Sequence, residues 1–197
     1  MRGMGAFPKP RMSVEEYLEL DRHSEVPLEY HDGEVFPIGW DGLWHGNIIL
    51  NVSGALVTRL EGKPCRPTTT ARVCPRERKY VYPDLMVYCG KAQFLPDGES
   101  VGNPTIIFEI LSRATRNYDY GEKFILYRKL RTLREYVLIA QDQPLIETYR
   151  FSEDGSWRLT SDSGLTAEVA LHSVGVSLPF SEIYKDVEFP LSEEVPS

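Results

Sequence analysis

The chain has 197 residues, of which 42% are hydrophobic and 26% are charged, and its formal net charge at pH 7 is −7. This length and composition are those of one ordinary globular domain with an ample core, and they exclude a disordered or fibrous chain. No apolar stretch approaches the roughly 20 residues that cross a bilayer, so we expect no membrane association and a cytoplasmic location.

The charges are unevenly distributed along the chain. Residues 13–34 contain eight acids and one base, whereas residues 59–79 contain seven bases and two acids. Residues 109–134 contain seven bases and three acids. The net acidity argues against a protein that grips nucleic acid over its whole surface. Two interpretations stay open: a solvated surface of mixed charge, or one face on which the two basic segments meet.

The chain begins with a lead-in, a helix and a hairpin. Residues 1–12 lack the apolar core of a secretory signal and are expected to be irregular. Ser13 and Glu16 have the spacing of a capping box, which predicts a helix over about residues 13–21. Residues 27–39 then predict a β-hairpin with Asp32-Gly33 as its turn.

A second helix and a strand are expected next. Apolar residues recur at helical spacing from residue 42 to residue 60, which predicts an amphipathic helix with Gly62 as its stop signal. Residues 63–75 are β-prone but contain several prolines, which predicts one strand near the edge of a sheet.

Three cysteines, Cys65, Cys74 and Cys89, form no CxxC pair, and their number is odd. This pattern favours free thiols in a reducing cytoplasm over a disulfide framework. The four histidines are scattered, so we do not expect a structural zinc site.

Two apolar, β-rich segments, residues 81–89 and 105–112, each contain one acid, Asp84 and Glu109. Burying a carboxylate without a partner is costly, so a cation or a metal ion is expected beside each. If the two strands are neighbours, the two acids can converge, and a hard ion such as Mg²⁺ would relieve their repulsion. For Asp84 alone, a cap at the start of its strand is an equally good interpretation.

A helix is expected after Glu109, beginning near Asn117 or Asp119. Asp119, Lys123 and Tyr127 then lie at i, i+4 and i+8, close to one helical face. Lys123 could offset the charge of the acid pair and orient a water molecule. On spacing alone, however, an exposed ion pair between Asp119 and Lys123 is the favoured interpretation.

Three strands and a tail complete the expected elements. Residues 134–140, 145–151 and 156–160 predict consecutive strands, and residues 178–197 predict one short helical turn followed by a loose polar tail. Strands and helices in this order predict an α/β or α+β fold with helices around one mixed central sheet.

Several motifs together resemble the Uma2-type proteins, a family common in cyanobacteria that belongs to the PD-(D/E)XK nuclease superfamily. They are YPDLMVY, IIFEILSRATRNYDYGEKFILYRKL and LREYVLI, with PLEYHDGEVFPIG and WHGNIILNVSGAL upstream. The resemblance covers about residues 13–185. It implies one restriction-endonuclease-like domain, residues 13–189, between the lead-in (1–12) and a polar tail (190–197).

The resemblance also implies the catalytic groups. Asp84 and Glu109 would be the metal-binding acids. The superfamily pattern has a lysine two residues after the glutamate, where this chain has Leu111. The resemblance therefore assigns the catalytic lysine to Lys123, in the following helix.

Four further residues match positions of the family. Glu29 corresponds to an upstream acid that often completes such sites, although one more charge in an acidic hairpin is an equal alternative. Asp119 would accompany Lys123 on its helix. His45 and Tyr127 would support the site, although packing is the favoured interpretation for both.

The expected function is that of a Mg²⁺-dependent endonuclease that hydrolyses phosphodiester bonds of DNA, with Mn²⁺ as a substitute metal. The alternative is a non-catalytic module on the same fold that binds nucleic acid or protein and has a regulatory role. A homodimer would enlarge the small footprint of a single domain on a duplex, and it is the assembly that we expect.

Overall fold

The computed structural model describes residues 11–39 and 42–190, so the lead-in and the tail fall largely outside the described residues. A six-stranded sheet forms its centre, with the strand order β10-β9-β8-β7-β6-β3. Its β7 and β8 run parallel, and its other neighbouring strands run antiparallel, which confirms the predicted mixed sheet. These strands are β3 (Cys65–Thr68), β6 (Leu85–Cys89), β7 (Pro104–Leu111), β8 (Glu135–Ala140), β9 (Leu145–Phe151) and β10 (Trp157–Ser163).

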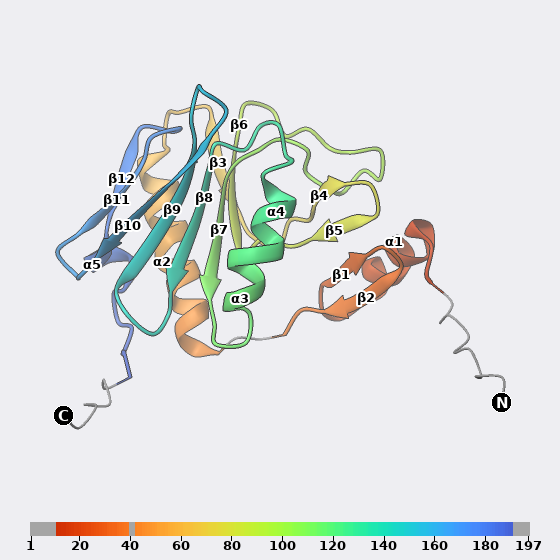
Figure 1. Cartoon of the computed structure of the whole chain (residues 1–197), viewed down its shortest axis with the longest axis horizontal. Helices are drawn as coiled ribbons and strands as arrows, with labels where there is room; N and C mark the ends of the chain where they lie inside the picture. Colours follow the sequence, from red (N-terminus) through yellow and green to blue (C-terminus); the bar gives the residue numbers. More distant parts are fainter. Residues whose placement is uncertain (1–10, 40–41, 191–197) are drawn as a thin grey trace, which may run out of the picture.

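Two smaller sheets accompany the central one. A four-stranded sheet, in the order β2-β1-β5-β4, lies with α1 to the right of the central sheet in Figure 1, and a β11-β12 pair lies to its left. The predicted hairpin around Asp32-Gly33 is confirmed as β1 and β2. The strands are β1 (Leu28–His31), β2 (Glu34–Pro37), β4 (Val73–Arg76), β5 (Lys79–Val81), β11 (Glu168–Leu171) and β12 (Val176–Pro179).

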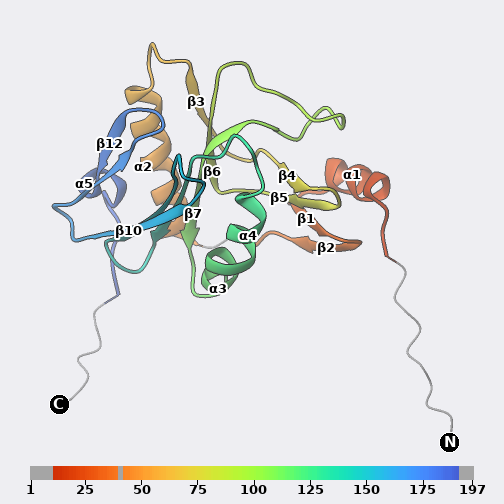
Figure 2. The same ribbon diagram turned by 45° about the horizontal axis from the view of Figure 1, so that its top comes forward.

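Helices cover both faces of the central sheet, with α2 on one face and the segment from α3 to α4 on the other (Figures 1 and 2). The capping box at the start of α1 is confirmed, since Ser13 and Glu16 exchange side-chain-to-backbone hydrogen bonds. The helical elements are α1 (Val14–His23), α2 (Leu43–Arg59), α3 (Arg116–Tyr118), the π-helical turn η1 (Asp119–Lys123), α4 (Phe124–Tyr127) and α5 (Phe180–Ile183).

Alternation along β7 divides the core into two layers. Phe108 and its same-face neighbours pack with α2, whereas Ile107 and Leu111 pack with the helical segment of residues 116–127. Glu109 points to the same face of β7 as Ile107 and Leu111. A parallel pair needs a crossover connection, and residues 112–134 provide it between β7 and β8. The crossover carries a helix across the face of the sheet that holds Glu109.

Two details differ from the predicted elements. Residues 63–75 form two strands instead of one, β3 at the edge of the central sheet and β4 at the edge of the four-stranded sheet. The prolines correctly indicated edges, but they could not reveal that the chain changes sheets between them. The short strands β11 and β12 were not predicted, because residues 168–179 lack a clear alternation.

The cysteine prediction is wrong for two of the three residues. Cys65 and Cys89 lie directly opposite each other in the β3–β6 pair and form a disulfide, whereas Cys74 is free. The number and spacing of the cysteines did not predict this bond, because it depends on the strand register that brings the two side chains together.

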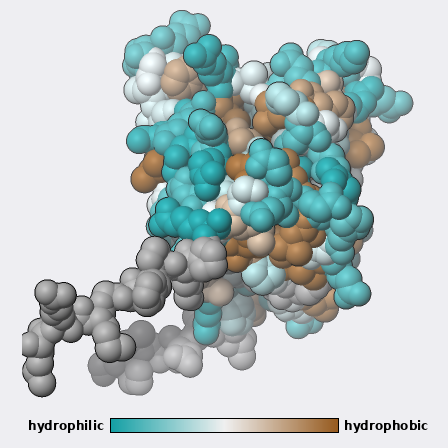
Figure 3. Space-filling model, turned by 90° about the vertical axis from the view of Figure 1, so that its right-hand side faces the viewer, coloured by the Kyte–Doolittle hydropathy of each residue, from teal (hydrophilic) through white to brown (hydrophobic). Residues whose placement is uncertain are grey.

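Several bases in the segment of residues 59–79 are already paired with groups of the same chain. Arg72 is buried and pairs with Asp21 and Glu99, and Lys63 donates to main-chain carbonyls. This arrangement weighs against two basic segments that meet as one large surface. Figure 3 shows a face that is mainly hydrophilic, with hydrophobic residues in separate patches. Within the described residues, no helix is both long and apolar enough to cross a membrane.

Candidate active site

Glu109 lies at the middle of the candidate site, on β7, with 2% of the residue exposed. Lys123 Nζ donates to Glu109 Oε1 at 3.0 Å, and Tyr127 Oη donates to the same oxygen at 2.7 Å. The pKa of Glu109 is raised well above its ordinary value because burial penalises the charged form, and Asp84 and Asp119 add repulsion that Lys123 only partly offsets.

Asp84 immediately precedes β6 and reaches the site from the rim of the sheet. The pairing of Leu85 with Phe108 places it beside Glu109. Its Oδ2 accepts a hydrogen bond from the Ile110 amide at 2.7 Å and lies 3.2 Å from His45 Nε2. Burial opposes its ionisation, but the contacts with His45, Lys123 and Ile110 lower its pKa.

Lys123 is the cation of this cluster. Its Nζ lies 3.0 Å from Glu109 Oε1, 3.5 Å from Asp119 Oδ1 and 3.7 Å from Glu29 Oε1. Burial disfavours the ammonium form, but the surrounding carboxylates outweigh it and raise the pKa of Lys123 well above its ordinary value. The lysine is therefore charged at neutral pH and holds the acids together.

The interpretation of Asp119 and Lys123 as an exposed ion pair is wrong, because both side chains are buried. They occupy the two ends of the π-helical turn, a wider turn that is frequent at functional sites. Asp119 Oδ1 lies within ion-pair distance of Lys123 and has no hydrogen-bond partner among the described residues. Burial raises the pKa of Asp119.

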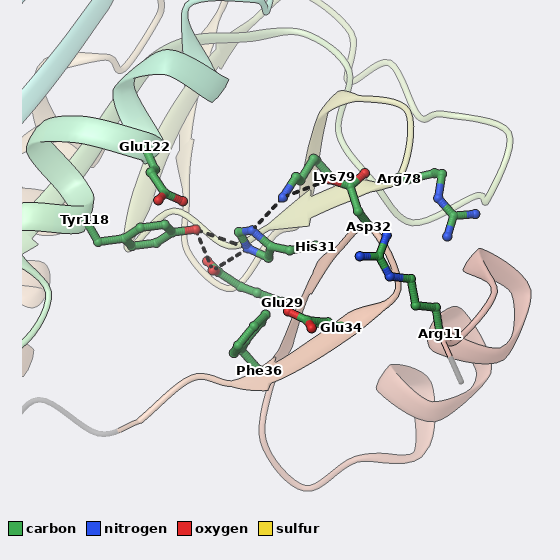
Figure 4. A pocket seen from close by; sticks show the side chains of 10 residues that line it. All are labelled: Arg11, Glu29, His31, Asp32, Glu34, Phe36, Arg78, Lys79, Tyr118 and Glu122. Atoms are coloured by element: carbon green, nitrogen blue, oxygen red, sulfur yellow. Dashed lines mark hydrogen bonds and ion pairs between the residues drawn. The ribbon is translucent and has the colours of Figure 1, made fainter. Parts of the chain in front are cut away.

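Glu29 joins the cluster from the four-stranded sheet. It accepts hydrogen bonds from Tyr118 Oη at 3.2 Å and from the Tyr82 amide at 3.3 Å, and it lies 3.3 Å from His31 Nε2 (Figure 4). Burial opposes its charge, yet Lys123 and His31 lower its pKa. Glu29 is 7% exposed, so its carboxylate contacts the buried cluster rather than solvent.

His31 connects Glu29 to a second lysine, as Figure 4 shows. Lys79 Nζ lies 3.2 Å from His31 Nδ1. An ammonium group can only donate, so Nδ1 accepts, and a neutral ring carries its proton on Nε2, toward Glu29. These side chains line a polar pocket of about 930 Å³ that borders the acid cluster.

The raised pKa of Glu109 predicts a pH dependence of stability in metal-free buffer. Above about pH 4.3, where an unfolded glutamate ionises, the folded protein still holds the Glu109 proton, so stability falls as the pH rises toward the folded pKa. We expect Glu109→Gln to flatten this fall in urea unfolding measured between pH 5 and pH 8. Parallel curves for the two proteins would contradict the raised pKa.

The donor set fits a hard divalent ion held by few protein ligands. Asp84 and Glu109 offer carboxylate oxygens, and both side-chain donors to Glu109 bind Oε1 rather than Oε2. In residues 11–39 and 42–190, no group of three or more His, Cys, Asp or Glu side chains is arranged to hold a metal ion. Mg²⁺ needs only one or two carboxylates, because water and substrate phosphates complete its shell. Zn²⁺ usually takes three or four protein ligands.

The structure thus brings together all seven of the predicted site residues, listed as Glu29, His45, Asp84, Glu109, Asp119, Lys123 and Tyr127. The sequence reasoning missed His31, Tyr118 and Lys79. His31 had a usable signal, because residues 29 and 31 of a strand share a face. Tyr118 and Lys79 had none, since their contacts depend on how the two sheets pack.

The fold is that of an α+β domain with a mixed central sheet, and the cluster lies on one face of that sheet. A solved structure from Anabaena variabilis, described as "a putative nuclease belonging to DUF820", shares the fold with a TM-score of 0.72 and 17% identity. The match covers 88% of this chain and 97% of that one.

Residues 14–181 match the Uma2 family, described as "Putative restriction endonuclease", and the chain belongs to this family. Two similar proteins from Synechocystis sp. bear the names "Uncharacterized protein slr1290" and "Uncharacterized protein sll1609". The first is 27% identical over 92% of this chain and 96% of its own length. The second is 30% identical over 80% of this chain and 91% of its own length.

Proposed function

We propose that this protein is a Mg²⁺-dependent endonuclease that hydrolyses phosphodiester bonds of DNA, with Mn²⁺ as a substitute metal. The observation that carries the proposal is the convergence of Asp84, Glu109 and Lys123 on one buried point, from a strand start, a strand and a crossover helix. Family membership supports the same class of reaction.

Each residue has a definite task in this proposal. Asp84 and Glu109 would hold the metal, which supplies Lewis-acid polarisation of a phosphoryl oxygen and an activated water when bound. Lys123 stays protonated, so its ammonium donates to the attacking water and to the negative charge that develops on the phosphoryl group. Tyr127 fixes the orientation of Glu109, and His45 does the same for Asp84.

In this proposal the basic side chains of the pocket beside Glu29 contact the sugar-phosphate backbone. Arg11, Arg78 and Lys79 line this pocket, together with the acids Glu29, Asp32, Glu34 and Glu122. Phosphate contacts of this kind set the position of a strand rather than read its sequence. The homodimer is part of the proposal, because a second copy would enlarge the small footprint of a single domain on nucleic acid.

A non-catalytic binding module is the second candidate, and one observation favours it. Lys123 already supplies a positive charge to the acids, with its Nζ 3.0 Å from Glu109 Oε1, so the acid cluster can persist without a metal. In that case the cluster would serve only to join the crossover helix to the sheet.

Cleavage assays distinguish the two candidates. We expect the purified protein to cut plasmid DNA and labelled oligonucleotides with Mg²⁺ or Mn²⁺ and not with EDTA. Asp84→Asn and Glu109→Gln should each lower the rate on the order of 100-fold or more. Glu153→Gln, which changes an exposed acid of the turn before β10, serves as the control and should cut at the wild-type rate. No cleavage with either metal, together with no metal binding by calorimetry, would reject the endonuclease.

A further inference from the structure

A second hollow opens on the other side of the acid cluster. It has a volume of about 710 Å³ and lies between α2 and the segments that lead into and out of β3 and β6. Asp84 and His45 line it, so it is continuous with the candidate active site. Most of its remaining wall is apolar, and Leu50 on its rim is 70% exposed. The apolar lining residues include Ile38, Ile49, Leu50, Pro67, Pro83 and Leu85.

The two hollows differ in chemistry. The pocket beside Glu29 contains charged side chains of both signs, whereas no arginine or lysine occurs among the described residues that line the pocket beside Asp84. The second pocket therefore offers little to a phosphate group. It does offer apolar walls and a few polar groups, among them the Ser53 hydroxyl, which has no hydrogen-bond partner within residues 11–39 and 42–190. Such walls with sparse polar groups are typical of pockets for small, flat organic ligands.

We infer that the pocket beside Asp84 binds one unstacked nucleobase, and that the substrate is single-stranded nucleic acid or a strand with an unpaired base. This inference rests on the proposed nuclease function, which brings a nucleotide to Asp84. A duplex keeps the faces of its bases stacked and presents its backbone and base edges, so it would leave the apolar walls without apolar contacts. An unpaired base exposes its π face, and that face packs well against apolar and aromatic side chains.

A second copy of the chain is a less suitable occupant. A protein surface seated in the pocket would cover the Asp84 carboxylate and close the path to the acid pair. A base in the pocket leaves the path to the acid pair open to the rest of its nucleotide, because Asp84 lies in the pocket wall.

Two glycines of α2 provide a matched pair of variants. Gly46 lines the pocket and Gly54 does not. At both positions an added Cβ meets no heavy atom within 4 Å, and neither has a backbone conformation that disfavours larger residues. Gly46→Leu should fill the pocket, whereas Gly54→Leu places the same side chain elsewhere on the helix. Both changes favour helix formation, so both proteins should fold.

Fluorescence anisotropy in EDTA measures binding without cleavage. The probes are a labelled single-stranded oligothymidylate, a strand of equal length built of abasic sites, and a duplex of equal length. We expect the wild-type protein and Gly54→Leu to bind the oligothymidylate about tenfold more tightly than the abasic strand, a ratio within the range for one stacked base. Gly46→Leu should bind the two strands equally.

Each other outcome has a definite meaning. Equal binding of the abasic strand by the wild-type protein, stronger binding of the duplex, or full retention of base-dependent binding in Gly46→Leu would overturn the inference. Sedimentation that shows a wild-type dimer and a Gly46→Leu monomer would assign the pocket to a second copy instead. Mg²⁺-dependent cleavage of duplex without base-dependent binding would leave the nuclease standing and remove the base pocket. Base-dependent binding without cleavage would support the base pocket and reject the nuclease.

Discussion

Replacing Lys123 with methionine should lower the free energy of unfolding by about 3–5 kcal/mol at neutral pH, the usual cost of removing one partner from a buried ionic cluster. Methionine keeps most of the side-chain volume, so the loss comes from the charge. The substitution leaves Glu109, Glu29 and Asp119 without the cation that now lies within 3.7 Å of each. DNA cleavage should fall to background in the same variant. Urea unfolding and a plasmid assay measure the two effects.

A double variant tests whether the fold depends on Lys123 through its contact with Glu109. In the Glu109→Gln background, Lys123→Met should cost clearly less, because one of the stranded carboxylates is gone. Lys129→Met changes an exposed lysine of the same crossover and should leave both stability and cleavage unchanged. Equal costs of Lys123→Met in the two backgrounds would contradict a direct coupling between Lys123 and Glu109.

Millimolar Mg²⁺ should restore part of the stability of Lys123→Met. An ion bound by Asp84 and Glu109 in the folded state would supply the missing positive charge, and a ligand that binds only the folded state stabilises it. The gain in Mg²⁺ should be larger for Lys123→Met than for the wild-type protein. If Mg²⁺ stabilises neither protein, the proposed metal site is rejected. The structural role of Lys123 is judged separately, from the stability of Lys123→Met without the metal.

Loss of the Cys65–Cys89 disulfide should lower the free energy of unfolding by about 3 kcal/mol, as expected for a crosslink that closes a loop of this size. The bond joins residues 24 positions apart and ties edge strand β3 to β6. Because β3 has only β6 as a neighbour in the central sheet, it has no second strand to hold it after reduction. The Cys65→Ala/Cys89→Ala double variant should unfold at lower urea than the wild-type protein.

Two measurements accompany this prediction. Cys74→Ala removes the free thiol and should leave the disulfide contribution intact. Thiol titration of the denatured protein should find one thiol before reduction and three after it. Three thiols before reduction, in protein purified without reductant, would show that the bond does not form.

The central features of the fold were predictable because they depend on local patterns. The capping box of α1, the Asp32-Gly33 hairpin and the apolar runs of β6 and β7 are set by residues a few positions apart. The acid in β7 was informative for the same reason, since a lone carboxylate in a buried strand demands a partner nearby.

The remaining features depend on contacts between distant segments. The disulfide follows from the β3–β6 register, and the contact between Glu29 and Lys123 follows from the packing of the four-stranded sheet beside the helix. Asp119 and Lys123 both face the buried acids from the π-helical turn, and no residue in this turn indicates a wider turn from sequence. Spacing alone therefore placed this pair on the surface.

The parallel pairing of β7 with β8 holds the segment that carries Lys123 at both of its ends. The contacts that Lys123 makes with Glu29, Glu109 and Asp119 all lie N-terminal to β8, so β8 supplies none of these partners. What β8 adds is a second anchor: the crossover that carries Lys123 is fixed at one end by β7 and at the other by the neighbouring β8. This double attachment restricts the chain that holds Lys123, so less conformational entropy is lost when the lysine contacts the acids.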